Sequence, residues 1–258
     1  MIKYLSSVKF TFYNLVLMIL LMGTGVGLSQ YFKSSFKMMN EINIMEWIEH
    51  SWSNKSMIVI WFALLCLSAG LLFLNALFCT FTKQVQVAIK SRAFQKWLFM
   101  VLHCLFIIVL ACHGLSLIIG SKQSNSQLFP GDHIIFNNEF MVKVSQVVFQ
   151  DDINILKADY KTQRGLMTRD NINRKHNYAD ISLIRHKELL ETKKVIMLSP
   201  LRYGSVQVTL SDFVLKDGKL GVNLNITKNH LNYFFFVVYA LMILTFGLYV
   251  FLSYRDIK

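Results

Sequence analysis

The sequence has little charge and almost no proline. Of its 258 residues, 16% are charged and two are proline, whereas 54% are hydrophobic. The apolar residues are clustered rather than periodic, and the composition is too apolar for a soluble domain of ordinary composition. The scarcity of charge therefore excludes an ordinary soluble protein and indicates that a lipid bilayer is the solvent for much of the chain.

Cysteine is scarce, and the polar part of the chain has none. All four cysteines lie in or at the ends of apolar segments, and residues 122–230 contain no cysteine. That region cannot form a disulfide of its own, and an exported domain without cysteine is not a thiol oxidoreductase. The sequence also lacks a CxxC zinc pattern, a Ser-His-Asp or paired-carboxylate pattern and a P-loop, so a hydrolase or an ATPase has little support.

Four long segments contain no Asp, Glu, Lys or Arg. A bilayer core requires about 20 consecutive apolar residues, and inside it only a helix satisfies its own backbone hydrogen bonds. We therefore predict a membrane protein with four transmembrane α-helices, at residues 10–30, 57–81, 97–120 and 231–253. The first segment could instead be a secretory signal, but it is long for the apolar region of a signal, so we expect an uncleaved anchor.

The positions of the basic residues predict the orientation. Segments 1–9, 82–96 and 254–258 contain Lys3, Lys9, Lys83, Lys90, Arg92, Lys96, Arg255 and Lys258 against a single acid, Asp256. Short loops rich in Lys and Arg stay in the cytoplasm, whereas long domains are translocated largely regardless of charge. We therefore expect both termini in the cytoplasm and residues 121–230 outside it. The net charge of +12 is then a topology signal and does not imply nucleic-acid binding.

The two outer segments differ in pattern. The first, at 31–56, places Trp47 and Trp52 among polar residues, which predicts a short interfacial helix with an aromatic anchor; a ligand-facing role is the alternative. The second, at 121–230, predicts an extracytoplasmic β-rich domain inserted between the third and fourth helices. Alternating apolar residues occur at 140–144, 206–210 and 220–226, which is the pattern of strands with one buried face.

Turn residues predict two hairpins in the β-rich domain. Asp217-Gly218 joins strands at 206–215 and 220–227 and favours a type I′ turn. Asn137-Asn138 is expected to join strands at 134–136 and 140–148. The polar stretch at 160–177 is predicted to be a loop or a short surface helix.

Short motifs carry a resemblance to a known family. The first span ends in Gly23–Gln30, with a Gly-Thr start and a final Gln, and the second ends in Phe78–Lys83, similar to Leu-Cys-Thr-x-x-Arg. The third contains His103-Cys104-Leu105, and downstream lie Pro130–Asp132 and Ser199–Gly204. In this order, with three spans, a domain and one more span, they resemble the ResB (CcsB) family of cytochrome c biogenesis proteins. Lys83, Cys104 and Ser199 depart from the family pattern, and the domain is shorter than expected.

The resemblance implies a function in a bacterial inner membrane. A ResB-like chain is the subunit of a system II cytochrome c synthase, a haem–apocytochrome c ligase. It pairs with a CcsA (ResC) subunit that has a tryptophan-rich haem-handling loop, which this sequence lacks. Together the two move haem b outward and join it to the CxxCH thiols of apocytochrome c. The expected partners are thus a CcsA-like subunit, apocytochrome c, haem and membrane lipid.

His103 and His113 are the two histidines within the predicted spans. An ionisable side chain there is a functional candidate, and imidazole is a common haem ligand. The helical rise separates them by about 15 Å, and ten residues turn a helix by about 280°, so we expect that they do not share a face and cannot both bind one haem. His103 matches the family's helix-opening His and is the predicted axial ligand, with His113 a weaker candidate. A hydrogen bond between helices is the alternative for His103.

The other candidates have simpler explanations. Cys104 and Cys112 are expected to pack as small apolar groups, and Asn75 to form a hydrogen bond between helices. Exposed histidines are expected to be bystanders, although His50 lies between two tryptophans on the outer side. They are His50, His133, His176, His186 and His230. The basic residues Arg164, Arg169, Arg174 and Lys175 could attract haem propionates or an acidic surface of apocytochrome c, but a solvated loop is the preferred explanation.

Two other functions fit the same composition. The first is a scaffold or assembly subunit of a membrane complex that binds no cofactor. The second is a receptor whose β-rich domain senses an external ligand, although the short tails offer no obvious cytoplasmic output.

Overall fold

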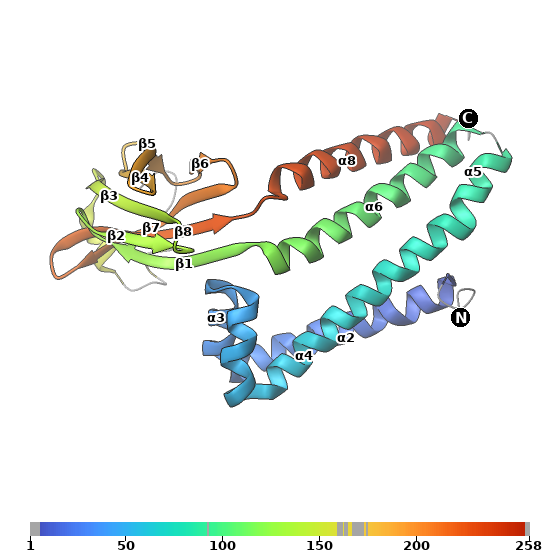
Figure 1. Ribbon diagram of the computed structural model, residues 1–258, viewed down its shortest axis with the longest axis horizontal. Coiled ribbons are helices and arrows are strands. Elements are labelled where there is room, and N and C mark those ends of the chain that lie inside the picture. The colour runs from blue at the N-terminus through green and yellow to red at the C-terminus, as the bar shows by residue number, and fades with distance from the viewer. Residues whose placement is uncertain are drawn as a thin grey trace. The chain divides into compact units, whose positions relative to one another are not determined.

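The computed structural model describes residues 6–91, 93–158, 162, 165–166, 173 and 175–255 (Figure 1). Most of the predicted loop at 160–177 lies outside the described residues, as do Arg164, Arg169 and Arg174. The chain divides into a helical unit (Met1–Met39, Ile44–Ile119, Leu231–Lys258) and a β unit (Asn40–Asn43, Gly120–His230).

Four helical segments of the helical unit are long and apolar enough to cross a membrane: Val8–Tyr31, Lys55–Ser91, Phe94–Ile119 and Asn232–Tyr254. They belong to α2 (Val8–Tyr31), α4 (Ile44–Cys79) with its continuation, α6 (Phe94–Ile119) and α8 (Asn232–Arg255). Among the described residues, the structure thus confirms four long apolar helices, as predicted from the charge-free segments. In Figure 1, α2 lies along α4 and α6 lies along α8.

The two segments between the first three apolar helices, at 31–56 and 82–96, are largely helical. The segment expected as a loop at 82–96 contains a π-helical turn at Thr80–Gln84 and α5 (Val85–Ser91), so α4 continues almost to the start of α6. The segment at 31–56, where a short helix was expected, contains α3 (Lys33–Glu41) and the first turns of α4, which bends at Lys55. Polar residues do not exclude a helix where it packs against its neighbours.

Trp47 has a different role from the one expected. Its side chain is fully buried rather than exposed to lipid headgroups. Its indole N–H donates to the carbonyl oxygen of Ser35 at 2.9 Å, and its ring meets Phe62 edge to face. Trp47 therefore fixes α3 against α4, while Trp52 is exposed and remains available as an interfacial anchor.

Polar contacts and one close approach join α2 to α4. Asn14 donates to the Ser68 carbonyl oxygen (2.9 Å) and accepts from the Ser68 hydroxyl (2.8 Å). Asn75 accepts from the Thr11 hydroxyl at 2.7 Å, as predicted for a helix–helix hydrogen bond. The Trp61 ring lies over Gly25, and its indole N–H donates to the Leu21 carbonyl oxygen at 2.7 Å. Within apolar surroundings these contacts select which faces of the two helices meet.

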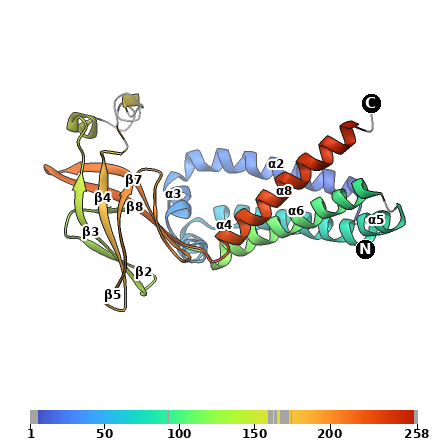
Figure 2. The same ribbon diagram turned by 90° about the horizontal axis from the view of Figure 1, so that it is seen from above.

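The β unit is a sandwich of two four-stranded antiparallel sheets (Figure 2). One sheet has the order β1-β8-β7-β6 and the other β2-β3-β4-β5. The strands are β1 (Ser121–Leu128), β2 (His133–Phe136), β3 (Phe140–Val148), β4 (Tyr178–Arg185), β5 (Glu188–Ile196), β6 (Leu201–Tyr203), β7 (Val206–Lys216) and β8 (Lys219–Lys228).

The predicted alternation places one face of each strand in the core. The apolar residues predicted at 140–144 and 206–210 are buried, as are those at 222–226, while Leu220 is partly buried against them. Both predicted hairpins are present, with positive φ at Asn137 and Asn138 and at Asp217 and Gly218. Positive φ at both central residues is the backbone of a type I′ turn.

Two of the family-like motifs mark the places where the chain crosses between sheets. Phe129 and Asp132 close a turn through Pro130 and Gly131, with positive φ at Gly131, between β1 and β2. The second crossing, from β5 to β6, ends in Leu201, which is fully buried in the core. These motifs therefore have a structural explanation in the sandwich.

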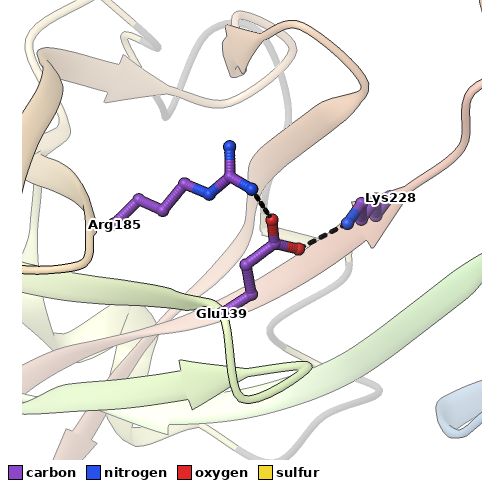
Figure 3. Close-up of polar contacts among 3 residues, drawn as sticks. All are labelled: Glu139, Arg185 and Lys228. Carbon is purple, nitrogen blue, oxygen red and sulfur yellow. Dashed lines mark hydrogen bonds and ion pairs between the residues drawn. The ribbon is translucent and has the colours of Figure 1, made fainter.

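A three-residue cluster ties the β2–β3 turn to the end of β8 (Figure 3). The Glu139 carboxylate pairs with the Arg185 guanidinium and accepts a hydrogen bond from the Lys228 ammonium at 2.5 Å. Both cations also lie over the Phe140 ring. The hydrogen bond from Lys228, with the charges of Lys228 and Arg185, holds the pKa of Glu139 below its usual value. The stabilisation by this carboxylate is therefore present at neutral pH and lost in acid.

Asp212, in the bulge of β7, is expected to have the opposite pH dependence. Burial raises the pKa of its carboxyl, and the hydrogen bond from the Phe213 amide opposes this only partly. An acid with a raised pKa favours the folded state below the unfolded pKa, about 3.9, and loses that contribution as the pH rises. Asp212→Asn keeps an acceptor and removes the charge. We expect it to raise the melting temperature at pH 7 by about 1–2 °C, because solvent screens a half-buried carboxyl.

Thermal unfolding of the full chain in detergent at pH 7 and pH 3 tests this expectation. The gain should vanish at pH 3, where both side chains are neutral. Asp217→Asn is the matched control, since it changes an exposed aspartate in a turn where Asn also tolerates positive φ. A gain that is equal at the two pH values would contradict the electrostatic explanation.

Candidate functional site

A groove lies between α6 and α8, and His103 lines it. Its volume is about 380 Å³. The wall from α6 consists of Phe99, Leu102, His103 and Phe106, and the wall from α8 of Met242, Ile243 and Phe246. Positions spaced by three, four and seven residues lie on one face of a helix, so the α6 residues form one surface. Apart from the imidazole, this lining is apolar.

The structure fixes the tautomer of His103. Its Nδ1 atom lies 2.8 Å from the carbonyl oxygen of Phe99, one turn earlier on α6. Since a carbonyl oxygen only accepts, Nδ1 carries the proton, and in the neutral imidazole the lone pair is on Nε2. Metal-binding histidines usually donate their second nitrogen in this way. The Phe99 ring also packs edge to face on the imidazole, with 4.4 Å between centroids, which restricts its rotation.

His113 lies on the same side of α6 as His103, contrary to the expectation from helical rotation. Its exposed ring stacks on Phe235 of α8, with centroids 5.2 Å apart, and Phe235 stacks in turn on Tyr239. A rotation of 280° equals 80° in the opposite sense, so both side chains can contact one neighbouring helix. The helical rise still separates them by about 15 Å, which excludes one haem bound by both.

The remaining candidates do not join this site. All four cysteines are free thiols, with Cys112 buried and Cys104 half-buried outside the groove lining. His50, His133, His176, His186 and His230 are exposed, as expected of bystanders. Of the four basic candidates in the polar loop, Lys175 is described, and it is exposed.

The groove fits one part of a haem. Small-molecule sites usually measure about 300–1,000 Å³ and are mostly apolar with a few placed polar groups, and this groove is at the small end of that range. It offers an apolar wall for a porphyrin and one imidazole nitrogen for iron. Within the described residues no three His, Cys, Asp or Glu side chains gather as a metal site. A second axial ligand would therefore have to come from outside the groove.

Sequence reasoning found one of the seven groove residues. Phe99 and Phe106 could have been found from their spacing of four and three residues around His103. The α8 residues had no such signal, because that helix is apolar on every side. Its contact face is therefore not visible in its hydrophobic pattern.

Comparisons with known proteins add no assignment: the chain matches no family model and no curated sequence.

Proposed function

We propose that this chain is a ResB-like subunit of a system II cytochrome c synthase, which holds haem in the membrane and positions it for attachment to apocytochrome c. The observation that carries the proposal is the apolar groove in which His103 presents Nε2. Four helices able to span a bilayer and a β-sandwich joined to two of them agree with the layout that the resemblance implies. The cargo is haem b.

The proposed contribution of this chain is positioning. Phe99 holds the imidazole by its carbonyl oxygen and its ring, so His103 loses little rotational freedom when it binds iron. The apolar walls would bind the porphyrin face and exclude water. A CcsA-like subunit would supply the other axial ligand, and the proximity of haem to the CxxCH thiols would be the chain's part in ligation.

The proposal includes an orientation. With the basic segments in the cytoplasm, α6 runs outward, and the β-sandwich lies on the periplasmic side of the inner membrane. His103 is then nearer to the cytoplasmic end of α6 and would meet haem from that side before His113.

Co-expression with a CcsA-like subunit tests the function. In bacteria that lack their own cytochrome c maturation genes, the pair is expected to purify as a complex with a Soret band and to produce covalent cytochrome c from a CxxCH-containing apocytochrome. The CcsA-like subunit expressed alone is the control. A scaffold role predicts that the pair forms without additional haem and without covalent cytochrome c, and that result would refute the proposal.

A further inference from the structure

Four apolar side chains form a row across the outer face of one sheet. Ile135 of β2 pairs with Met141 of β3, Met141 with Ile184 of β4, and Ile184 with Leu189 of β5. Paired residues of neighbouring strands point to the same face. Ile135 and Leu189, on the two edge strands, expose 56% and 63% of their surface. These four residues are called the apolar row.

The apolar row is bordered along its strands by polar residues. The next row along the same strands is polar and consists of His133, Lys143, Ser182 and Thr192, paired in the same order. A contiguous exposed apolar patch marks a protein or membrane contact more often than chance exposure. The abrupt change from an apolar to a polar row defines an edge to that contact.

The apolar row lies at the end of the sandwich where the chain enters and leaves it. Just beyond the row, Glu139, two residues from Met141, and Arg185, next to Ile184, meet Lys228 (Figure 3). Lys228 pairs with Ser121, and these two residues are four before the start of α8 and two after the end of α6. An extended residue spans at most about 3.6 Å. The row is therefore held by a short tether to the ends of two helices able to span a bilayer.

A basic and an aromatic side chain lie at the same end of the sandwich as the apolar row. The turn residue Lys187 is exposed, as is its neighbour Glu188. The Asn229 amide donates to the Ser205 carbonyl oxygen at 2.9 Å, which brings the β6–β7 turn and the exposed Tyr203 to the same end. Apolar, basic and tyrosine side chains together are typical of surfaces that bind lipid headgroups.

We propose that the apolar row is a lipid-docking surface, with Ile135 and Leu189 entering the headgroup region of the leaflet that α6 and α8 cross. Lys187 then faces anionic headgroups, and the polar row stays in water. The inference rests on α6 and α8 crossing a membrane and is independent of haem binding. The surface would hold the sandwich against the bilayer at a second place besides its two chain connections.

Depth-dependent fluorescence quenching tests the proposal. The full chain is placed in nanodiscs that contain phosphatidylglycerol, in a background with the four native cysteines replaced by alanine. Bimane is attached to Ile135→Cys or Leu189→Cys, and to the polar-row controls Lys143→Cys and Thr192→Cys. The apolar-row labels are expected to emit at shorter wavelength and to be quenched by brominated acyl chains. The control labels should be quenched by iodide in the aqueous phase instead.

Lipid composition and partner proteins separate the alternatives. Replacing phosphatidylglycerol by phosphatidylcholine should weaken the quenching by brominated lipid at positions 135 and 189. Amide exchange of residues 184–189 in the unmodified chain should be slower with the anionic lipid, which guards against misfolded variants. Quenching by iodide at all four positions would overturn the proposal. The proposal would also be overturned if the labels at 135 and 189 were protected from both quenchers only in the presence of a second protein or a second copy of the chain.

Discussion

The complex containing His103→Ala is expected to lose most of its haem. If His103 binds iron as proposed, its removal should weaken haem binding by at least about tenfold, because losing a residue that only supports a metal ligand already costs that much. The Soret absorbance per complex should fall accordingly, as measured on the purified pair with the CcsA-like subunit. Covalent cytochrome c formation should fall with it.

Three variants make the His103 result specific. His103→Gly should regain the Soret band when imidazole is added, because the free ligand can enter the space left by the side chain. Cys104→Ala, at the adjacent position, and His113→Ala, on the same side of α6, should keep haem near the wild-type level. Unchanged haem content in His103→Ala would remove this residue as the ligand. If His113→Ala lost the haem instead, the site would lie at the other end of α6.

Gly25→Ala is expected to destabilise the α2–α4 pair by about 1–3 kcal/mol, the range for overpacking a close contact. A Cβ atom at Gly25 would overlap a ring carbon of Trp61. The indole would have to move, and its hydrogen bond to the Leu21 carbonyl oxygen would lengthen or break. The effect is measured by thermal unfolding in detergent, with the reaction of the free cysteines with a thiol dye as the signal of unfolding.

Gly23→Ala and Gly27→Ala are matched controls on the same helix. Neither position has an atom within 4 Å of the added Cβ, so these variants should melt at or above the wild-type temperature. Trp61→Leu should remove most of the penalty of Gly25→Ala in a double-mutant cycle. Equal melting of all three glycine variants would show that the close approach of Trp61 does not limit stability.

The helices and half of the strands could be predicted because their signals are local. A charge-free run of some 20 residues has few alternatives to a spanning helix, and Asp-Gly or Asn-Asn between alternating segments predicts a hairpin. Strand β1 was missed because it is an edge strand made almost wholly of polar residues. The β4–β5 turn uses His186 and Lys187 with positive φ, and this pair lacks the Gly, Asn or Asp that usually signals such a turn.

Of the candidate site, the sequence could predict His103 but not the residues that surround it. His103 was identified because an imidazole within an apolar span is unusual. Its surroundings depend on which face of α8 meets α6, and lipid and protein neighbours are equally apolar, so hydrophobicity does not encode that choice. Trp47 was assigned to the headgroups for a related reason, since the sequence shows an amphipathic side chain but not the Ser35 carbonyl oxygen that satisfies it.

Because Ser121 pairs with Lys228, the β-sandwich can be regarded as an insertion in the hairpin of α6 and α8. Both connections join the sandwich at adjacent strands. The end of α6 and the start of α8 are therefore close together, whatever is placed between them. A short linker between α6 and α8 would therefore also keep the two helices of the groove next to each other. A chain in which residues 122–227 are exchanged for a two-residue turn should still bring His103 opposite Phe246, which makes the β-sandwich exchangeable without loss of the groove.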